Sequence, residues 1–156
     1  ILRILGKLNY SQIIASGNKF DDPTFPSNTS ALINPDRTET ELSPEEKGNG
    51  AIDLVLTEEI FNGEPYKLFD NIDPCDIVQG LVGNCYYLAS IAALAEWPER
   101  IQNVFVTKEV NKAGCYVLSL YICGEKINLV LDDYIPCTDW DQKPAFTRTK
   151  QREIWV

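Results

Sequence analysis

Residues 79–94 read QGLVGNCYYLASIAAL and place a glutamine six positions before a cysteine that opens an apolar run. Gly83 and Asn84 come directly before Cys85. Glycine is common in turns and asparagine is a favoured N-cap, so we expect a helix to begin at Cys85. The run to about residue 96 contains small and apolar residues on every face, which is typical of a helix buried nearly all round. The stretch therefore predicts a central buried helix that carries a cysteine in its first turn.

A cysteine in that position has a chemical use. The partial positive charge at a helix N-terminus favours the thiolate, which is the nucleophilic form of cysteine. An amide N–H of Gln79 held beside the backbone N–H of Cys85 would supply two donors to the oxyanion of an acyl-transfer intermediate. The alternative is a buried core cysteine preceded by an ordinary loop glutamine, because cysteine is among the most frequently buried residues. The local pattern leaves both interpretations open.

Four segments together resemble one protein family. Residues 76–89, DIVQGLVGNCYYLA, resemble the active-site signature of the calpain family of cysteine proteases. Three further segments are similar to other blocks of that family and occur in the family's order, namely 20–32 (FDDPTFPSNTSAL), 127–136 (INLVLDDYIP) and 152–155 (REIW). The resemblance covers residues 20–156. It implies an α+β fold, the first lobe of a papain-like protease, with the buried cysteine-bearing helix and a small antiparallel β-hairpin or sheet.

The resemblance also implies roles for single residues. Cys85 matches the catalytic nucleophile and Gln79 the amide of the oxyanion hole. Asp76 and Glu153 match the acidic residues of a calcium site, which main-chain carbonyls near residues 69–72 would complete. Carboxylate and carbonyl oxygens are suitable calcium ligands. Without the resemblance, both acids would be read as solvated surface residues.

Two departures and one absence bear on activity. The family's usual Asp before the nucleophile is Asn84 here, and its usual Trp after it is Tyr86. The chain contains no histidine, whereas calpains supply the catalytic histidine and asparagine from a second lobe. We therefore expect this chain to be an internal fragment, truncated inside the protease core and inactive by itself. The complete protein is either a calcium-dependent cysteine endopeptidase or an inactive calpain-like domain that serves as a scaffold or interaction module.

Composition narrows the partners and the location. The formal charge is −9 and 44 % of the residues are hydrophobic, which suits a folded domain and argues against nucleic-acid binding. Five cysteines without a CxxC pair indicate neither a zinc site nor a disulfide framework, and favour an intracellular, cytoplasmic setting. No run approaches the length of a transmembrane helix. The expected partners are protein substrates or protein partners and a second protease lobe.

The N-terminal third reads differently from the remainder. Residues 1–50 are interpreted as a lead-in, with a helical turn at 11–15 before Gly17, followed by an extended strap at 21–35 and an acidic loop at 36–50. Residues 51–156 form the predicted lobe. At its start, residues 51–56 suit a strand and 54–61 a helical turn, and the pattern does not choose between them.

The remaining elements follow from turn and strand signals. A second helix is predicted at 99–106 after Pro98. Residues 115–122 and 126–135 predict a hairpin around the turn at Cys123. Asp132 and Asp133 then close the second strand, either as turn or surface acids or as ligands. Three cysteines are interpreted as packing residues, namely Cys115, Cys123 and Cys137, and residues 154–156 as an apolar edge that further chain would cover.

Overall fold

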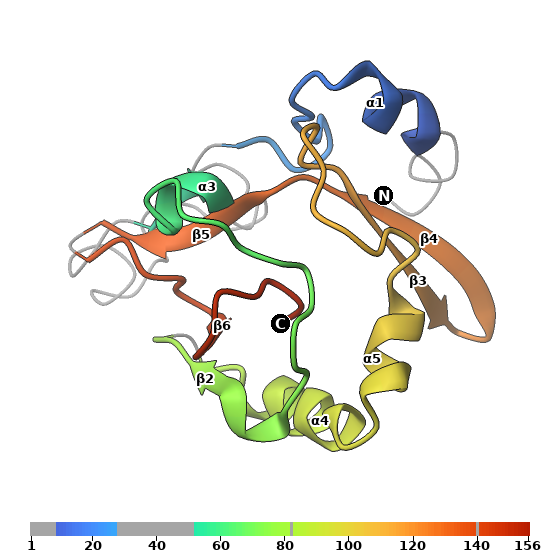
Figure 1. The fold of residues 1–156 in the computed structure, drawn as a ribbon. Helices are drawn as coiled ribbons and strands as arrows, with labels where there is room; N and C mark the ends of the chain where they lie inside the picture. Colours follow the sequence, from blue (N-terminus) through green and yellow to red (C-terminus); the bar gives the residue numbers. More distant parts are fainter. Residues whose placement is uncertain (1–8, 28–51, 82, 140) are drawn as a thin grey trace, which may run out of the picture.

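The computed structural model describes residues 9–27, 52–81, 83–139 and 141–156. This part of the chain forms short helices and short strands (Figure 1). In chain order they are α1 (Tyr10–Ser16), β1 (Ile52–Leu56), α3 (Thr57–Ile60), the 3₁₀ turn η4 (Pro74–Asp76), β2 (Ile77–Gln79), α4 (Cys85–Ala95), α5 (Pro98–Val104), β3 (Tyr116–Ile122), β4 (Glu125–Leu131), β5 (Tyr134–Thr138) and β6 (Thr147–Thr149).

The strands of the described residues form three antiparallel pairs: β1 with β5, β2 with β6, and β3 with β4. The predicted α+β class is confirmed. Two of these pairs join segments that lie far apart in the sequence, with Ile52 opposite Thr138 and Ile77 opposite Thr149. None of the described helices has the length and apolar character needed to cross a membrane.

The predicted hairpin is confirmed as β3 and β4. Cys123 and Gly124 form its two-residue turn with φ angles of 53° and 82°, the left-handed conformation that such tight turns require. The second strand ends at Leu131 and not at residue 135, because Asp132 and Asp133 interrupt it and the chain then pairs with β1 as β5. Cys123 is exposed at the turn, so its predicted packing role is wrong.

The hairpin separates two apolar clusters. One lies toward α4 and α5 and includes Ala95, Phe105, Tyr116 and Trp155. The other, which we call the outer cluster, consists of Phe20, Ala113, Cys115, Val117 and Val130, and three residues of α1 pack against it, namely Tyr10, Ile13 and Ile14. Trp155 is only 5 % exposed, so the predicted apolar edge at 154–156 is wrong at this residue because the core already covers it.

Helix α4 begins at Cys85 and ends one residue earlier than predicted. The prediction that it is buried nearly all round is wrong for the described residues. Leu88 and Ala95 are its buried positions, whereas Tyr86 and Tyr87 are 77 % and 52 % exposed. The reason is that the core packs on one side of the helix, which lies at the periphery of the lobe (Figure 1).

The N-terminal predictions are confirmed where the structure describes them. Helix α1 contains the predicted turn and ends at Gly17, whose φ of 66° is left-handed. The described part of the strap, residues 21–27, contains no helix or strand, as expected. The rest of the strap and the acidic loop, 28–50, lie outside the described residues. In the next segment both interpretations hold in succession, since strand β1 runs directly into helix α3.

Candidate active site

Cys85 is the first residue of α4, and its side chain is exposed. Asn84 occupies the predicted N-cap position, but its side chain makes no capping hydrogen bond. The main-chain carbonyl of Asn84 instead accepts from the N–H groups of Tyr87 and Leu88 at 2.9 and 3.1 Å. The structure thus places the thiol at a helix N-terminus in contact with solvent, where its reactivity is favoured.

Gln79 is the exposed last residue of strand β2, with Thr147 opposite it on β6. The next two residues are held firmly: the N–H groups of Gly80 and Leu81 donate to the carbonyls of Phe146 and Ala145 at 2.9 and 2.8 Å. A Cβ on Gly80 would lie 2.1 Å from the Ala145 oxygen. Glycine is therefore required where the chain leaves Gln79 for Cys85, a requirement that the sequence motif alone did not explain.

Two of the other four cysteines differ from Cys85 in exposure. Cys115 and Cys137 are fully buried, which confirms their predicted packing role. Burial raises the pKa of each of these thiols to about 11, and a nearby acid, Asp132 for Cys115 and Asp141 for Cys137, adds to the effect. Cys75 and Cys123 are exposed, but neither lies at the start of an α-helix.

Glu153 is 5 % exposed, so it is not a surface acid. Its Oε1 atom accepts from the N–H of Asn71 at 3.0 Å, whereas Oε2 is buried without a hydrogen-bond partner among the described residues. The backbone of Glu153 also bridges to Lys67. The structure thus brings Glu153 against the loop at 69–72, as the calcium interpretation requires.

Asp76 lies at the end of η4, and its main-chain carbonyl accepts from the N–H of Lys150 at 2.9 Å. The segment 150–153 therefore contacts both the Asp76 turn and the loop at 69–72. No group of three or more acidic, cysteine or histidine side chains that could hold a metal occurs among the described residues. Any cation here would need main-chain carbonyls beside the two carboxylates, and the unpartnered oxygen of Glu153 suits a hard cation.

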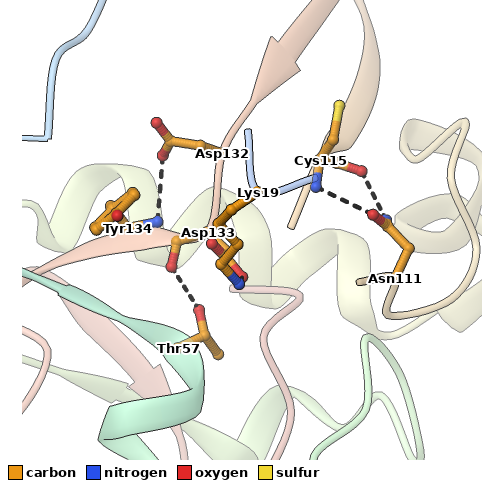
Figure 2. Close-up of polar contacts among 7 residues, drawn as sticks. All are labelled: Lys19, Thr57, Asn111, Cys115, Asp132, Asp133 and Tyr134. Carbon is orange, nitrogen blue, oxygen red and sulfur yellow. Dashed lines mark hydrogen bonds and ion pairs between the residues drawn. The ribbon is translucent and has the colours of Figure 1, made fainter. Parts of the chain in front are cut away.

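Asp133 contradicts the prediction of a turn or surface acid. Its side chain is fully buried and lies 2.7 Å from the ammonium group of Lys19 (Figure 2). Asp132 is partly buried and accepts from the N–H groups of Asp22 and Tyr134 at 2.9 and 3.2 Å. The sequence carried no signal for the contacts with Lys19 and Asp22, because these residues lie 114 and 110 positions before the acids.

Residues 20–156 match the sequence profile of the calpain family cysteine proteases. The chain belongs to the calpain family of cysteine proteases. It is 33 % identical over 147 residues to the calpain-type cysteine protease ADL1 of Oryza sativa subsp. japonica, which covers 92 % of this chain and 7 % of that protein. It is 30 % identical over 132 residues to the calpain-2 catalytic subunit of Homo sapiens, covering 83 % of this chain and 18 % of the human protein.

A second plant calpain, DEK1 of Arabidopsis thaliana, is 37 % identical over 105 residues, which are 67 % of this chain and 5 % of that protein. The chain thus spans less than a tenth of the length of the plant calpains it matches.

Proposed function

We propose that this chain is the first lobe of a calcium-dependent, intracellular cysteine endopeptidase that cleaves proteins at limited sites. The observation that carries the proposal is the exposed thiol of Cys85 at the first position of α4, joined by a short connection to the rigidly held end of β2 at Gln79. The two residues match the nucleophile and oxyanion positions of the family. The absence of disulfides among the five cysteines, all of which are described, supports an intracellular, cytoplasmic location.

The proposed chemistry follows from where each group lies. The Cys85 thiolate attacks the carbonyl carbon of the scissile peptide. The N–H of Cys85, one of the first N–H groups of a helix, has no partner within that helix, so it is available to the developing oxyanion. The side-chain amide of Gln79 is the second donor.

The proton transfers need a group from elsewhere. A general base must receive the thiol proton, and a general acid must protonate the leaving amine. Histidine usually fills both roles near neutral pH, and this chain contains none. We assign the histidine to a second protease lobe, with a protein substrate bound in extended form between the two lobes.

Calcium is proposed to bind at Asp76 and Glu153 together with main-chain carbonyls of 69–72. The support is the buried, unpartnered Oε2 atom of Glu153 and the hydrogen bond between Glu153 and Asn71. When bound, a divalent cation would supply positive charge that compensates both carboxylates. It would tie the 69–72 loop to the segment that follows β6.

One observation favours a second candidate function, a calpain-like scaffold that no longer cleaves. The Oδ1 atom of Asn84 is buried without a partner among the described residues and lies directly before the nucleophile position. Tyr86, which directly follows Cys85, is 77 % exposed. Asn84 and Tyr86 stand where the family usually has Asp and Trp. A surface altered at these two positions would bind a protein without cleaving it.

Covalent labelling separates the two functions. A polypeptide that joins residues 1–156 to a histidine-bearing second lobe is treated with an epoxide peptide analogue, with and without calcium, and the modified residue is mapped by mass spectrometry. We expect calcium-stimulated labelling of Cys85, lost in Cys85→Ser and strongly reduced in Gln79→Ala. The matched control is Gln102→Ala, on α5. Absence of labelling under both conditions would refute the protease and support the scaffold.

A further inference from the structure

The N-terminal segment 9–24 covers the outer face of the β3–β4 hairpin. Helix α1 packs with Tyr10, Ile13 and Ile14 on the outer cluster, and the N–H of Phe20 donates to the carbonyl of Ala113 at 2.8 Å. Helix α1 and Lys19 both precede the part of the chain that matches the calpain family, which begins at residue 20.

Helix α1 has only seven residues. Helices of this length are not stable alone in water. Tyr10, Ile13 and Ile14 are partly buried, and none of its residues is fully buried. The helix must consequently be held in place both by its own packing on the outer cluster and by the contacts that its flanking residues make with the lobe.

Lys19 makes the strongest of these contacts. Its ammonium group lies 2.7 Å from Oδ2 of Asp133, and the exposed fractions of the two side chains are 36 % and 0 %. Burial alone would lower the pKa of Lys19, but the hydrogen bond and charge of Asp133 outweigh it, and the pKa is raised. The positive charge is thereby kept beside the buried carboxylate.

Loss of the ion pair would cost Asp133 more than Lys19, because the Asp133 side chain is fully buried whereas that of Lys19 is partly exposed. Oδ1 of Asp133 is buried and has no hydrogen-bond partner among the described residues. The backbone of Asp133 is held in place, because its carbonyl accepts from both the N–H and the hydroxyl of Thr57, at 3.0 and 2.8 Å. Gly114 also lies so close that a Cβ there would be 2.4 Å from the carboxyl group.

We propose that residues 9–24, which we call the cover, can detach from the outer face of the β3–β4 hairpin. The Lys19–Asp133 ion pair is the contact that holds the cover in place. If Lys19 leaves or loses its charge, Asp133 becomes a buried charge without compensation, which is strongly unfavourable. The cover then opens and exposes the outer cluster, while the two other strand pairs remain intact. Asp132, which accepts from the N–H of Asp22, is a second and weaker contact of the same cover.

Two buried cysteines provide the test within one molecule. Cys115 belongs to the outer cluster beneath the cover, whereas Cys137 lies on β5, and both are 0 % exposed. Iodoacetamide labelling of the 156-residue chain, read by peptide mass spectrometry, thus reports cover opening at Cys115 and loss of the β1–β5 pair at Cys137. In Lys19→Met we expect Cys115 to label about tenfold faster or more, with Cys137 unchanged.

The matched control is Lys67→Met, which removes the exposed Lys67–Asp70 ion pair and should alter neither rate. The double variant Lys19→Met with Asp133→Asn should bring the Cys115 rate back toward that of the unchanged chain, because no buried charge is left unpaired. The proposal is overturned if Lys19→Met leaves Cys115 protected, if both cysteines become reactive together, or if the double variant labels as fast as the single one.

Hydrogen exchange on the unchanged chain tests the same cover without any substitution. The backbone amides of α1 should exchange through an opening of lower free energy than the amides of β3 and β4. Equal protection of α1 and the hairpin would show that the cover does not open separately, and would overturn the proposal.

Discussion

Gly80 has no room for a side chain, since a Cβ would lie 2.1 Å from the Ala145 oxygen and 2.5 Å from the Ala145 carbonyl carbon. Both obstacles are backbone atoms, which cannot rotate away. We expect Gly80→Ala to lower the free energy of unfolding by about 1–3 kcal/mol, as overpacking does. Urea denaturation followed by circular dichroism measures this change.

The control is Gly83→Ala in the same connection, because nothing lies within 4 Å of a Cβ there. Its free energy of unfolding should stay within about 0.5 kcal/mol of the unchanged chain. If the two variants are equally stable, the close approach of Gly80 to Ala145 does not constrain the chain that leads from Gln79.

The five thiols should divide by burial. Cys75, Cys85 and Cys123 are exposed, so we expect iodoacetamide to modify them in the folded chain. Cys115 should be modified only when the cover opens or the chain unfolds, and Cys137 only after unfolding, because both are buried and burial raises the pKa of each to about 11. At pH 8 roughly one such thiol in a thousand is ionised.

Peptide mapping at pH 8, with and without urea, measures this division. Labelling of Cys137 in the folded chain at the rate of Cys123 would contradict it. So would protection of Cys85, whose exposure at the start of α4 is the basis of the proposed chemistry.

The connection between β5 and β6 contains an acid whose effect depends on pH. The hydroxyl of Thr138 and the backbone N–H and ammonium group of Lys143 hydrogen-bond or pair with Asp141, and they lower its pKa to about 2. A carboxyl group with a lowered pKa in the folded state stabilises that state above its ordinary pKa. This contribution is lost as the pH falls from about 4 through 2.

We therefore expect Asp141→Asn to flatten the fall in the free energy of unfolding between about pH 4 and pH 2. Urea midpoints measured across this range test it.

Asp132 is the opposite case, since burial raises its pKa despite two backbone hydrogen bonds. Asp132→Asn should remove a loss of stability that sets in as the pH rises above about 4, and urea midpoints measured from pH 4 upward test it. A slope equal to that of the unchanged chain, below pH 4 for Asp141→Asn or above pH 4 for Asp132→Asn, would contradict the corresponding expectation.

Local elements were predictable and distant pairings were not. The hairpin could be read from two apolar runs around a two-residue turn at Cys123, and α4 from the residues that flank its start. Strands β2 and β6 have three residues each and pair across about 70 positions, so neither carries an alternating pattern long enough to recognise. The buried state of Asp133 was missed for the same reason, because Lys19 lies 114 positions away.

In the candidate site, too, features set by neighbouring residues could be predicted and features set by distant contacts could not. Gln79 and Cys85 are close in sequence, and the structure places Cys85 at the predicted start of its helix. Their catalytic roles stay a prediction. Glu153 could be matched to a calcium ligand only through the family resemblance, since nothing local distinguishes it from a surface acid. The contact with Asn71 that brings it against the 69–72 loop spans 82 positions.

At the scale of the whole molecule, calcium should stabilise the lobe if Glu153 binds it. A ligand present at 100 times its dissociation constant stabilises the folded state by about 2.7 kcal/mol. We expect the melting temperature of the chain to rise with calcium and not with equal magnesium, and Glu153→Gln to abolish the rise. Differential scanning fluorimetry measures both.

The control is Glu64→Gln, because Glu64 is an exposed acid that pairs with Arg152 at 3.1 Å. It should retain the response to calcium. A response that survives in Glu153→Gln would place calcium elsewhere on the chain, and no response in any variant would refute the proposed site.

Residues 1–156 alone should not hydrolyse peptides, with or without calcium, because the chain has no histidine to act as general base and acid. Release of a fluorogenic peptide product over several hours measures this. Calcium-stimulated turnover that disappears in Cys85→Ser would contradict the expectation and show that another group performs the proton transfers.

The long-range contacts of the N-terminal segment also set an order for folding during synthesis. Lys19 must wait for Asp133, and Phe20 for Ala113, before either has a partner. At ribosomal speeds of 5–20 residues per second, the wait for Asp133 lasts on the order of ten seconds. Throughout that interval the apolar face of α1 has no folded lobe to pack against. This early part of the chain is consequently among the last to fold, and until then its apolar face is open to chaperones.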